Sequence, residues 1–304
     1  MEKLYAEYYE QDRFSGITSS YWQEYASQTK VLKKGDDFII SGVSYGQILK
    51  RSLPAYIHNI VPGALNKYLM HKYRIDKKVK QRGFQVAYRQ NRLFDYNCAR
   101  QMLCVNSIFK NIGLEKSGMV AVIGDGYGFT ASLIKLLYPQ ATVICVNLGK
   151  MLIVDVLYIK KVFPETRSML INDKGDFNKC DQGSILFLEA EKYQLLYSQP
   201  VCLFVNIDSM QEMTEEVIKT YFDIMRSSTV ESYFYSCNRV EKKLPDGTVI
   251  KFSDYPWDKR DAILIDEKCQ WCQKFPLEQP PFWRYMDGPV QHRLIRLFRR
   301  NGNQ

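Results

Sequence analysis

A short apolar segment that ends directly in a run of glycines constrains the fold of this chain more than any other feature. Residues 119–123 read MVAVI, and residues 124–128 continue as GDGYG. The β-branched apolar residues predict a buried strand. Alternate glycines let the backbone turn sharply and approach a ligand with no Cβ in the way. Residues 130–138 then follow a helical pattern that Pro139 ends, so we expect a strand, a ligand-binding turn and a helix in this order.

The same alternation continues along the chain. Further strands are predicted at residues 142–146 (TVICV), 168–171, 201–207 (VCLFVNI) and 232–237 (SYFYSC). Helical patterns cover residues 151–163 and the segment after Thr214, which can cap its helix. A hairpin turn is predicted at residues 245–247 (PDG). Apolar strands that alternate with helices indicate an α/β fold with a parallel sheet covered on both faces, and ligands of such sheets bind beyond the carboxyl ends of the strands.

The first part of the chain lacks this alternation. We expect a mostly helical amino-terminal region at residues 1–110, with a substrate, lid or docking role, and the sheet domain at residues 111–304. Between Lys67 and Arg92, nine Lys or Arg residues face a single acid, Asp76. This basic stretch fits either a solvated helical face or a dock for phosphate or a membrane surface.

Composition sets the class of protein and of partner. The 304 residues include 42 Lys and Arg against 33 Asp and Glu, a net charge of +9, which favours an anionic partner. No apolar run reaches the roughly 18 residues of a membrane helix, and the acidic, tyrosine-rich start lacks the apolar segment of a signal peptide. We therefore expect a cytoplasmic protein, at most peripheral to the inner face of the membrane.

The eight cysteines are too few for a disulfide scaffold in a chain of this length. Cys145 and Cys202 lie in apolar stretches, where a free thiol behaves as a small hydrophobic group. Cys269 and Cys272 have the spacing of a metal or redox pair, but no second pair exists and the nearest histidine is His292. The sequence thus favours buried thiols over zinc and predicts no metal site.

The spacing of the glycines narrows the class of ligand. A dinucleotide-binding fingerprint needs a third glycine at position 129, where this chain has Phe129. The Gly-Lys-Ser/Thr ending of a phosphate-binding P-loop is also missing. The tighter G-x-G-x-G pattern resembles motif I of the class I S-adenosylmethionine-dependent methyltransferases.

A longer resemblance narrows this further. Four segments, VIGDGYGFTASLIKLLYP, VICVNLGKMLIVDVLYIKKVFP, LFVNIDSMQEMTEEVIKTYFDIM and SYFYSCNRVEKKLPDGTVIKFSDYPW, together resemble a family of sugar O-methyltransferases found with bacterial surface-glycan biosynthesis. The resemblance spans roughly residues 90–300, with a weaker echo at residues 20–22 (SYW), and is most specific at residues 206–213 and 238–242. It implies a Rossmann-like class I methyltransferase sheet and S-adenosylmethionine as cofactor.

In that family the glycine loop packs against the amino acid part of the cofactor, and the second strand ends at the ribose. The resemblance therefore implies cofactor contacts from Gly124, Asp125, Gly126, Tyr127, Gly128, Asn147 and Asn206. Val122 and Asn147 stand where the superfamily usually has acids. The amide oxygen of Asn147 still accepts a hydrogen bond, but each lost charge-assisted bond costs about 1.5–3 kcal/mol, so we expect a reduced affinity.

Methyl transfer to a sugar hydroxyl requires the donor and acceptor in line and a general base. Asp208, directly after the strand at residues 201–207, and His292, with a pKa suited to proton transfer, are the leading candidates. Glu212 comes third, because a residue just ahead of a helix also serves as a helix cap. The alternative for His292 is a solvated surface residue.

The acceptor is expected to contact Gln211, Asn238, Arg239 and Trp257. An aromatic face beside Asn, Arg and Asp suits the apolar and polar edges of a sugar ring, and Arg239 is also suited to grip a phosphate or sugar acid in bidentate fashion. The alternative for Trp257 is packing in the core or a lid. The carboxyl-terminal run is either a further phosphate or membrane contact or a solvated tail: Arg293, Arg296, Arg299 and Arg300.

The sequence thus predicts an S-adenosylmethionine-dependent O-methyltransferase whose partner is a sugar or glycan acceptor, carried on a nucleotide or lipid diphosphate. The first alternative is a methyltransferase for another small molecule or nucleic acid. We expect nucleic acid not to be the partner, because residues 206–213 (NIDSMQEM) lack the Asn-Pro-Pro-Tyr type of motif that favours base methylation. The second alternative is a non-catalytic relative that binds the cofactor.

Overall fold

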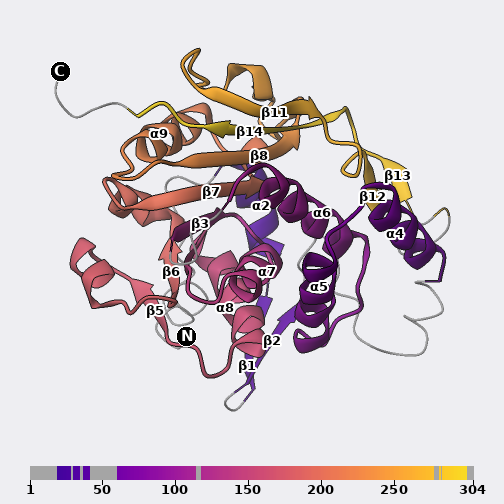
Figure 1. Cartoon of the computed structure of the whole chain (residues 1–304), viewed down its shortest axis with the longest axis horizontal. Helices are drawn as coiled ribbons and strands as arrows, with labels where there is room; N and C mark the ends of the chain where they lie inside the picture. The colour runs from indigo at the N-terminus through magenta and orange to yellow at the C-terminus, as the bar shows by residue number, and fades with distance from the viewer. Residues whose placement is uncertain are drawn as a thin grey trace.

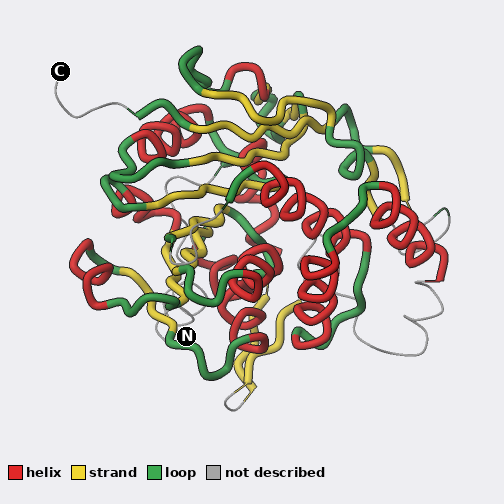
Figure 2. The backbone as a smooth tube through the Cα atoms, in the orientation of Figure 1, coloured by secondary structure: helices red, strands yellow, loops and turns green. Residues whose placement is uncertain are grey.

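The computed structural model describes residues 19–28, 30–34, 37–41, 60–113, 118–276, 281 and 283–299. A twisted sheet of eight strands forms its centre (Figures 1 and 2). From one edge to the other, the order is β11 (Ala262–Lys268), β14 (Val290–Arg296), β8 (Tyr233–Arg239), β7 (Val201–Ile207), β3 (Met119–Ile123), β4 (Thr142–Asn147), β6 (Ile185–Glu189) and β5 (Ser168–Ile171).

The six neighbouring strands β8, β7, β3, β4, β6 and β5 are parallel to one another. Strand β14 runs antiparallel to both β8 and β11. The chain enters the sheet at β3, places β4 on one side and later places β7 on the other. Such a reversal of strand order leaves a crevice at the carboxyl ends of the central strands. The mostly parallel, Rossmann-like sheet predicted from the sequence is confirmed.

Both faces of the sheet are buried, which explains why its strands are almost continuously apolar. In β3, Val120 and Val122 point into one core, and Ala121 and Ile123 point into the core on the opposite face. Helices from α4 to α8 contribute to the first core, and α9 with the 3₁₀ segment η3 (Ala190–Leu196) contributes to the second. The helices are α2 (Ser20–Gln28), α4 (Ile60–Lys72), α5 (Lys77–Arg89), α6 (Tyr96–Asn111), α7 (Phe129–Leu137), α8 (Gly149–Val162) and α9 (Glu215–Arg226).

Side-chain caps fix the start of three helices. The carboxylates of Asp76 and Asp95 accept hydrogen bonds from backbone N–H groups in the first turns of α5 and α6. Thr214 caps α9 as predicted, because its hydroxyl accepts a hydrogen bond from Val217 N at 3.4 Å. Helix α6 is then buried along most of its length and carries Arg100 and Cys104 against the sheet.

The amino-terminal region, expected to be mostly helical, also contains a pair of strands. There β1 (Lys30–Lys34) and β2 (Asp37–Ser41) form an antiparallel ribbon. Gly and Asp between two segments with β-branched residues are a hairpin signal. Helices α5 and α6 pack on α7, so this part of the region shares a core with the sheet, and the boundary at residue 110 stays a prediction.

Two further ribbons lie beyond the sheet. In β9 (Glu241–Lys243) and β10 (Val249–Lys251) the predicted hairpin is confirmed, and Gly247 adopts φ 89° in its turn. The second ribbon pairs β12 (Lys274–Pro276) with β13 (Trp283–Tyr285). Among the described residues, no helix combines the length and apolar character that crossing a bilayer requires.

Candidate functional site

The glycine loop between β3 and α7 has a backbone that only glycine adopts readily. Gly124, Gly126 and Gly128 have φ values of 72°, 81° and 61°. Close packing adds a second requirement, since a Cβ on Gly124 would lie 2.1 Å from Ser209 Oγ and one on Gly128 would lie 2.3 Å from Ile159 Cγ1. Gly124 N donates to Val146 O at 2.8 Å, which ties the loop to β4.

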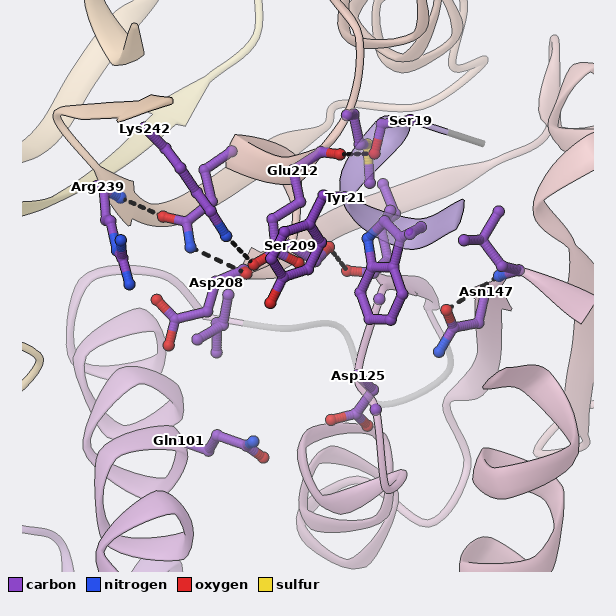
Figure 3. A pocket seen from close by; sticks show the side chains of 18 of the residues that line it. Ser19, Tyr21, Gln101, Asp125, Asn147, Asp208, Ser209, Glu212, Arg239 and Lys242 are labelled. Atoms are coloured by element: carbon purple, nitrogen blue, oxygen red, sulfur yellow. Dashed lines mark hydrogen bonds and ion pairs between the residues drawn. The ribbon is translucent and has the colours of Figure 1, made fainter. Parts of the chain in front are cut away.

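Together with the carboxyl ends of β3, β4 and β7, this loop lines a cavity of about 420 Å³. The volume is in the range of small-molecule and cofactor sites. Figure 3 shows the labelled side chains around it, with Asn147 on one side, Asp208, Arg239, Glu212 and Lys242 on the other, and Asp125 between them. The cavity thus lies at the reversal of strand order, where ligands of open α/β sheets bind.

Within the loop, Asp125 lines the cavity and also caps α7. Its carboxylate accepts hydrogen bonds from Thr130 N at 3.0 Å and Ala131 N at 2.8 Å. Burial raises the pKa of Asp125 to about 6, against the lowering effect of these two N–H donors. Its charge therefore changes just below neutral pH.

The carboxyl end of β4 presents Asn147 to the cavity. Asn147 Nδ2 donates to Asp155 Oδ2 at 2.8 Å, and Asn147 Oδ1 accepts from Leu148 N at 2.9 Å. Asp155 also accepts from Gly128 N at 3.0 Å, and burial raises its pKa well above the ordinary value. Asp155 of α8 thus fixes the amide of Asn147 and the third glycine together.

At the tip of β7, Asp208 is held in a strained backbone conformation. Its φ is 60°, a region that non-glycine residues seldom occupy and that clusters at functional sites. Its backbone N donates to Cys237 O at 2.8 Å, and its Oδ2 forms an ion pair with Arg100 of α6. Asp208 Oδ1 is buried and has no hydrogen-bond partner among the described residues.

The Arg100 side chain of this ion pair is buried. Burial disfavours its guanidinium charge, but Asp208 opposes this effect and the pKa of Arg100 rises above its ordinary value. Arg100 Nη1 and Nε are also buried without a partner among the described residues. A buried ion pair with unsatisfied donors and an unsatisfied acceptor indicates a place for a polar ligand.

A second buried ion pair joins Glu212 of the 3₁₀ turn η4 (Met210–Glu212) to Lys242 of β9. Burial raises the pKa of Glu212 and lowers that of Lys242, while each partner counteracts the effect on the other. The Lys242 ammonium also lies 3.8 Å from the ring centroid of Tyr21, and Ser19 Oγ donates to Glu212 O. Helix α2 thereby closes one wall of the cavity.

Gln211 and Arg239 connect these groups. Gln211 Oε1 accepts from Arg239 N at 2.6 Å, and Gln211 Nε2 donates to Asp208 O at 3.3 Å. Both side chains line the cavity. Gln211 therefore joins the tips of β7 and β8, and Arg239 stands beside Asp208 as an additional cation.

The predicted site residues fall into two groups. Those that line the cavity are Gly124, Asp125, Gly126, Tyr127, Asn147, Asp208, Gln211, Glu212 and Arg239. The structure does not bring the others to its wall: Gly128, Asn206, Asn238, Trp257 and His292. For these five, direct contact with a ligand in this cavity is not supported.

The two asparagines form an internal network below the cavity floor. Asn206 Nδ2 donates to Ile123 O at 3.0 Å and to Ser209 Oγ at 2.7 Å, and Asn238 Nδ2 donates to Asn206 Oδ1 at 2.9 Å. Both side chains are fully buried. The two amides fix the turn after β7, because Met210 N donates to Asn206 Oδ1 at 2.9 Å and Gln211 N donates to Asn238 Oδ1 at 3.2 Å.

His292 and Trp257 pack against hydrophobic side chains instead: His292 of β14 lies against Tyr235 and Trp271, and Trp257, which follows the 3₁₀ turn η5 (Phe252–Asp254), is partly buried against the other core. His292 is 1% exposed, and its Nδ1 lies 3.0 Å from Tyr235 Oη. Trp257 stacks with Phe234 and Tyr255 and donates through Nε1 to Phe252 O at 2.8 Å. The prediction of His292 as a base and of Trp257 as a sugar platform is therefore not supported, and the core role weighed for Trp257 fits.

The cavity contains residues that the sequence did not single out. Helix α6 contributes Arg100 and Gln101, Ser19 precedes α2, and β13 contributes Arg284. The sequence contains features that could have indicated some of the cavity residues. Arg100 interrupts the apolar face of a helix, and residues 20–22, of which Tyr21 and Trp22 line the cavity, belong to the weaker resemblance.

The two basic segments singled out in the sequence, residues 67–92 and 293–300, lie mostly outside the cavity wall. In the carboxyl-terminal run, Arg293 pairs with Asp266, Arg296 pairs with Glu231, and Arg299 donates to Thr229 O. Arg300 lies outside the described residues. Of the stretch from Lys67 to Arg92, Arg92 reaches the cavity wall. A membrane contact through these segments stays a prediction.

Comparison with known proteins gives structural likenesses alone. No family model matches the chain, and no curated protein matches it. A cyclopropane synthase from Mycobacterium tuberculosis matches 45% of this chain at 13% identity and a TM-score of 0.31, and this chain covers 42% of that structure. Coclaurine N-methyltransferase bound to N-methylheliamine and SAH matches 66% of this chain and 73% of its own, at 8% identity and a TM-score of 0.40.

A third likeness is to an arsenic(III) S-adenosylmethionine methyltransferase from Chlamydomonas reinhardtii. It covers 64% of this chain and 71% of its own, at 12% identity and a TM-score of 0.37. At such identities and scores these structures assign no function to this chain. The function has to be argued from the cavity itself.

Proposed function

We propose that this chain is an S-adenosylmethionine-dependent methyltransferase that methylates a sugar hydroxyl, in bacterial surface-glycan biosynthesis. One observation carries the proposal: a single cavity has bare glycine backbone on one side and, on the other, Asp208 Oδ1, which has no partner in the part of the chain that the structure describes. The first side suits a cofactor that lies flat on the main chain, and the second suits an acceptor that has a proton to lose.

The residues of the first side fit the cofactor. The unsubstituted Cα atom of Gly126 allows close approach, and Asn147 Oδ1, which accepts one hydrogen bond, has capacity for a second one from a ribose hydroxyl. The loop is held in place at Tyr127, whose backbone O accepts from Gln90 Nε2 at 2.9 Å. When bound, S-adenosylmethionine supplies an electrophilic methyl group on a sulfonium.

On the second side, Asp208 is the proposed general base. Its Oδ2 pairs with Arg100, which leaves Oδ1 to accept the hydroxyl proton of the acceptor. The strained backbone at Asp208 and its hydrogen bond to Cys237 O hold the carboxylate at the mouth of β7. Glu212 is a weaker candidate, because Lys242 occupies its carboxylate.

Cations around the acceptor side favour a phosphate-bearing sugar, carried on a nucleotide or a lipid diphosphate. On this side Arg100, Arg239 and Lys242 line the cavity, whereas Arg92 lies over the ring of Tyr127 in the glycine loop. Arg239 has no contact shorter than 3.9 Å to its carboxylate partner Asp287, and its planar guanidinium is suited to bidentate binding of phosphate.

The test is a transfer assay with S-adenosylmethionine labelled in its methyl group and a panel of nucleotide sugars and lipid-diphosphate sugars. The expected product is an O-methyl sugar whose formation requires Asp208. Transfer to an amine, an arsenical or a nucleic acid, with no transfer to any sugar, would contradict the sugar proposal. Binding of S-adenosylmethionine without transfer to any acceptor would support the non-catalytic alternative.

A further inference from the structure

Four cysteines that are far apart in the sequence meet at one point of the core. They are Cys104, Cys237, Cys269 and Cys272, and their Sγ atoms all lie within 4.8 Å of one another. All four are fully buried and free of disulfides. The sequence indicated the pair at 269 and 272 and missed the other two, because the spacing of residues along the chain does not reveal cysteines on other elements.

Three separate elements supply the thiols. Cys104 comes from α6, Cys237 comes from β8, and Cys269 and Cys272 come from the turn after β11. We propose that these four cysteines form a structural site for a single divalent metal ion of the thiolate-preferring kind, zinc above all.

The spacing of the thiols suits one ion. Four sulfur atoms placed about 2.3 Å from a tetrahedral centre are about 3.8 Å apart, which agrees with a group confined within 4.8 Å. The Cys-x-x-Cys turn supplies two ligands at the separation that structural zinc sites use. An ordinary buried thiol packs alone in an apolar surrounding, as Cys145 does in β4.

The turn that carries two of the ligands is fixed by its own hydrogen bonds. Cys272 N donates to Cys269 O at 3.2 Å, and Cys269 N donates to Val290 O at 2.9 Å. The side chain of Gln273 donates to both of these carbonyl groups, at 2.6 and 2.7 Å. The geometry of the pair therefore does not depend on a disulfide.

A donor already points at one sulfur. Trp271 Nε1 donates to Cys104 Sγ at 3.3 Å, and Tyr96 Oη holds the same residue by donating to Trp271 O at 2.9 Å. Donors of this kind stabilise the negative charge of metal-bound thiolates and orient them. His292 is not one of the proposed ligands, because its Nδ1 pairs with Tyr235 Oη and its Nε2 lies 3.5 Å from Glu267 Oε1.

The cysteine site lies next to the Arg100–Asp208 ion pair, which indicates a structural role for a bound ion. Cys104 lies one helical turn from Arg100 on α6, and Cys237 O accepts the backbone hydrogen bond of Asp208. An ion bound to both cysteines would hold α6 and β8 at a fixed separation and so keep the Arg100–Asp208 pair in register. The cysteines bind the ion as thiolates, so each thiol that still carries a proton releases it, and no oxidation state changes.

The test begins with metal analysis of the untagged full chain, purified under reducing conditions without chelator. We expect about one zinc per chain, as for a closed four-thiolate site. A mercurial titration of the native protein should release this zinc in step with modification of the four thiols. Apoprotein refolded with Co²⁺ should show the absorption bands of tetrahedral thiolate coordination.

The paired variant Cys269→Ser/Cys272→Ser should lose this metal, and Cys145→Ser, equally buried but outside the site, should keep it. Metal below about one tenth per chain, both as purified and after reconstitution with Zn²⁺, would overturn the proposal. So would wild-type metal content in the paired variant, or iron with labile sulfide in place of zinc. If the paired variant does not fold, the titration of the unaltered chain decides alone. None of these readouts requires methyl transfer, so the metal site and the proposed enzyme activity stand or fall separately.

Discussion

The two sides of the cavity are built in opposite ways. The glycine side comes from one continuous segment of chain, where residues 124–128 follow β3 and their backbone forms the wall. The acceptor side comes from charged side chains of three separate segments of the chain, namely α6, the turn after β7, and β8 with β9. One side therefore depends on the absence of side chains, and the other on their precise pairing.

This difference separates two kinds of failure. Damage to the glycine side should abolish cofactor binding while the acceptor groups stay in place. Damage to the acceptor side should leave cofactor binding intact and remove transfer or stability. The following variants test this separation.

The largest effect is expected for Asp208→Asn. The amide cannot take a proton, so methyl transfer at saturating cofactor should fall by about 10²–10⁴ while affinity for S-adenosylmethionine stays the same. Single-turnover kinetics and calorimetry measure the two quantities. Asp181→Asn, at an exposed ion pair, serves as the control. Full activity in Asp208→Asn would remove this residue as the base and turn attention to Glu212→Gln.

The corresponding variant on the glycine side of the cavity is Gly126→Val. Gly126 has φ 81° and lines the cavity, so a branched side chain would both strain the loop and fill the space above it. We expect about a thousandfold loss of affinity for S-adenosylmethionine by calorimetry. Gly113→Ala, at a glycine with no neighbouring atom near its would-be Cβ, should bind normally. Unchanged affinity in Gly126→Val would place the cofactor elsewhere.

Lys242→Met should affect stability rather than cofactor affinity. The change leaves the Glu212 carboxylate buried without its partner, which costs about 3–5 kcal/mol in comparable buried pairs. Denaturant unfolding measures the loss. Adding Glu212→Gln to the same chain should restore much of the stability, because no charge is then left buried. No recovery in the double variant would show that packing against Tyr21, and not the charge pair, accounts for the loss.

The smallest effect is a pH dependence of cofactor affinity that comes from Asp125. Burial raises the pKa of this carboxyl to about 6, so it is charged at pH 7.5 and largely neutral at pH 5. A fall in pH removes negative charge beside the loop and weakens the cap of α7, and affinity for the cationic cofactor should drop several-fold, since nearby opposite charges contribute about 1 kcal/mol. Asp125→Asn should flatten the profile. A profile of the same shape in this variant would assign the titration to another group.

The sequence was a good guide to the glycine side for a physical reason. A strand, a glycine turn and a helix are adjacent in the chain, so their pattern is local, and residues 119–147 fold as predicted. The exception is Gly128, which is required by its contact with Ile159 and not by the cavity.

The acceptor side was predicted only in part. Asp208, Gln211 and Glu212 follow a strand tip and were found, but their partners Arg100 and Lys242 belong to other elements, and no spacing rule connects them. His292 was chosen for its chemistry, which says nothing about which way a strand points its side chains. Cys104 and Cys237 were missed because they lie on other elements than the motif at residues 269–272, and the spacing of that motif does not reveal them.

The most direct test of the account is the structure of this chain with S-adenosylhomocysteine bound at saturation. The account predicts that the ligand lies on the backbone of Gly124 and Gly126, with its ribose at Asn147 and its sulfur turned toward Asp208. Electron density for the ligand at any other place, or a cavity that stays free of it at saturating concentration, would contradict the account.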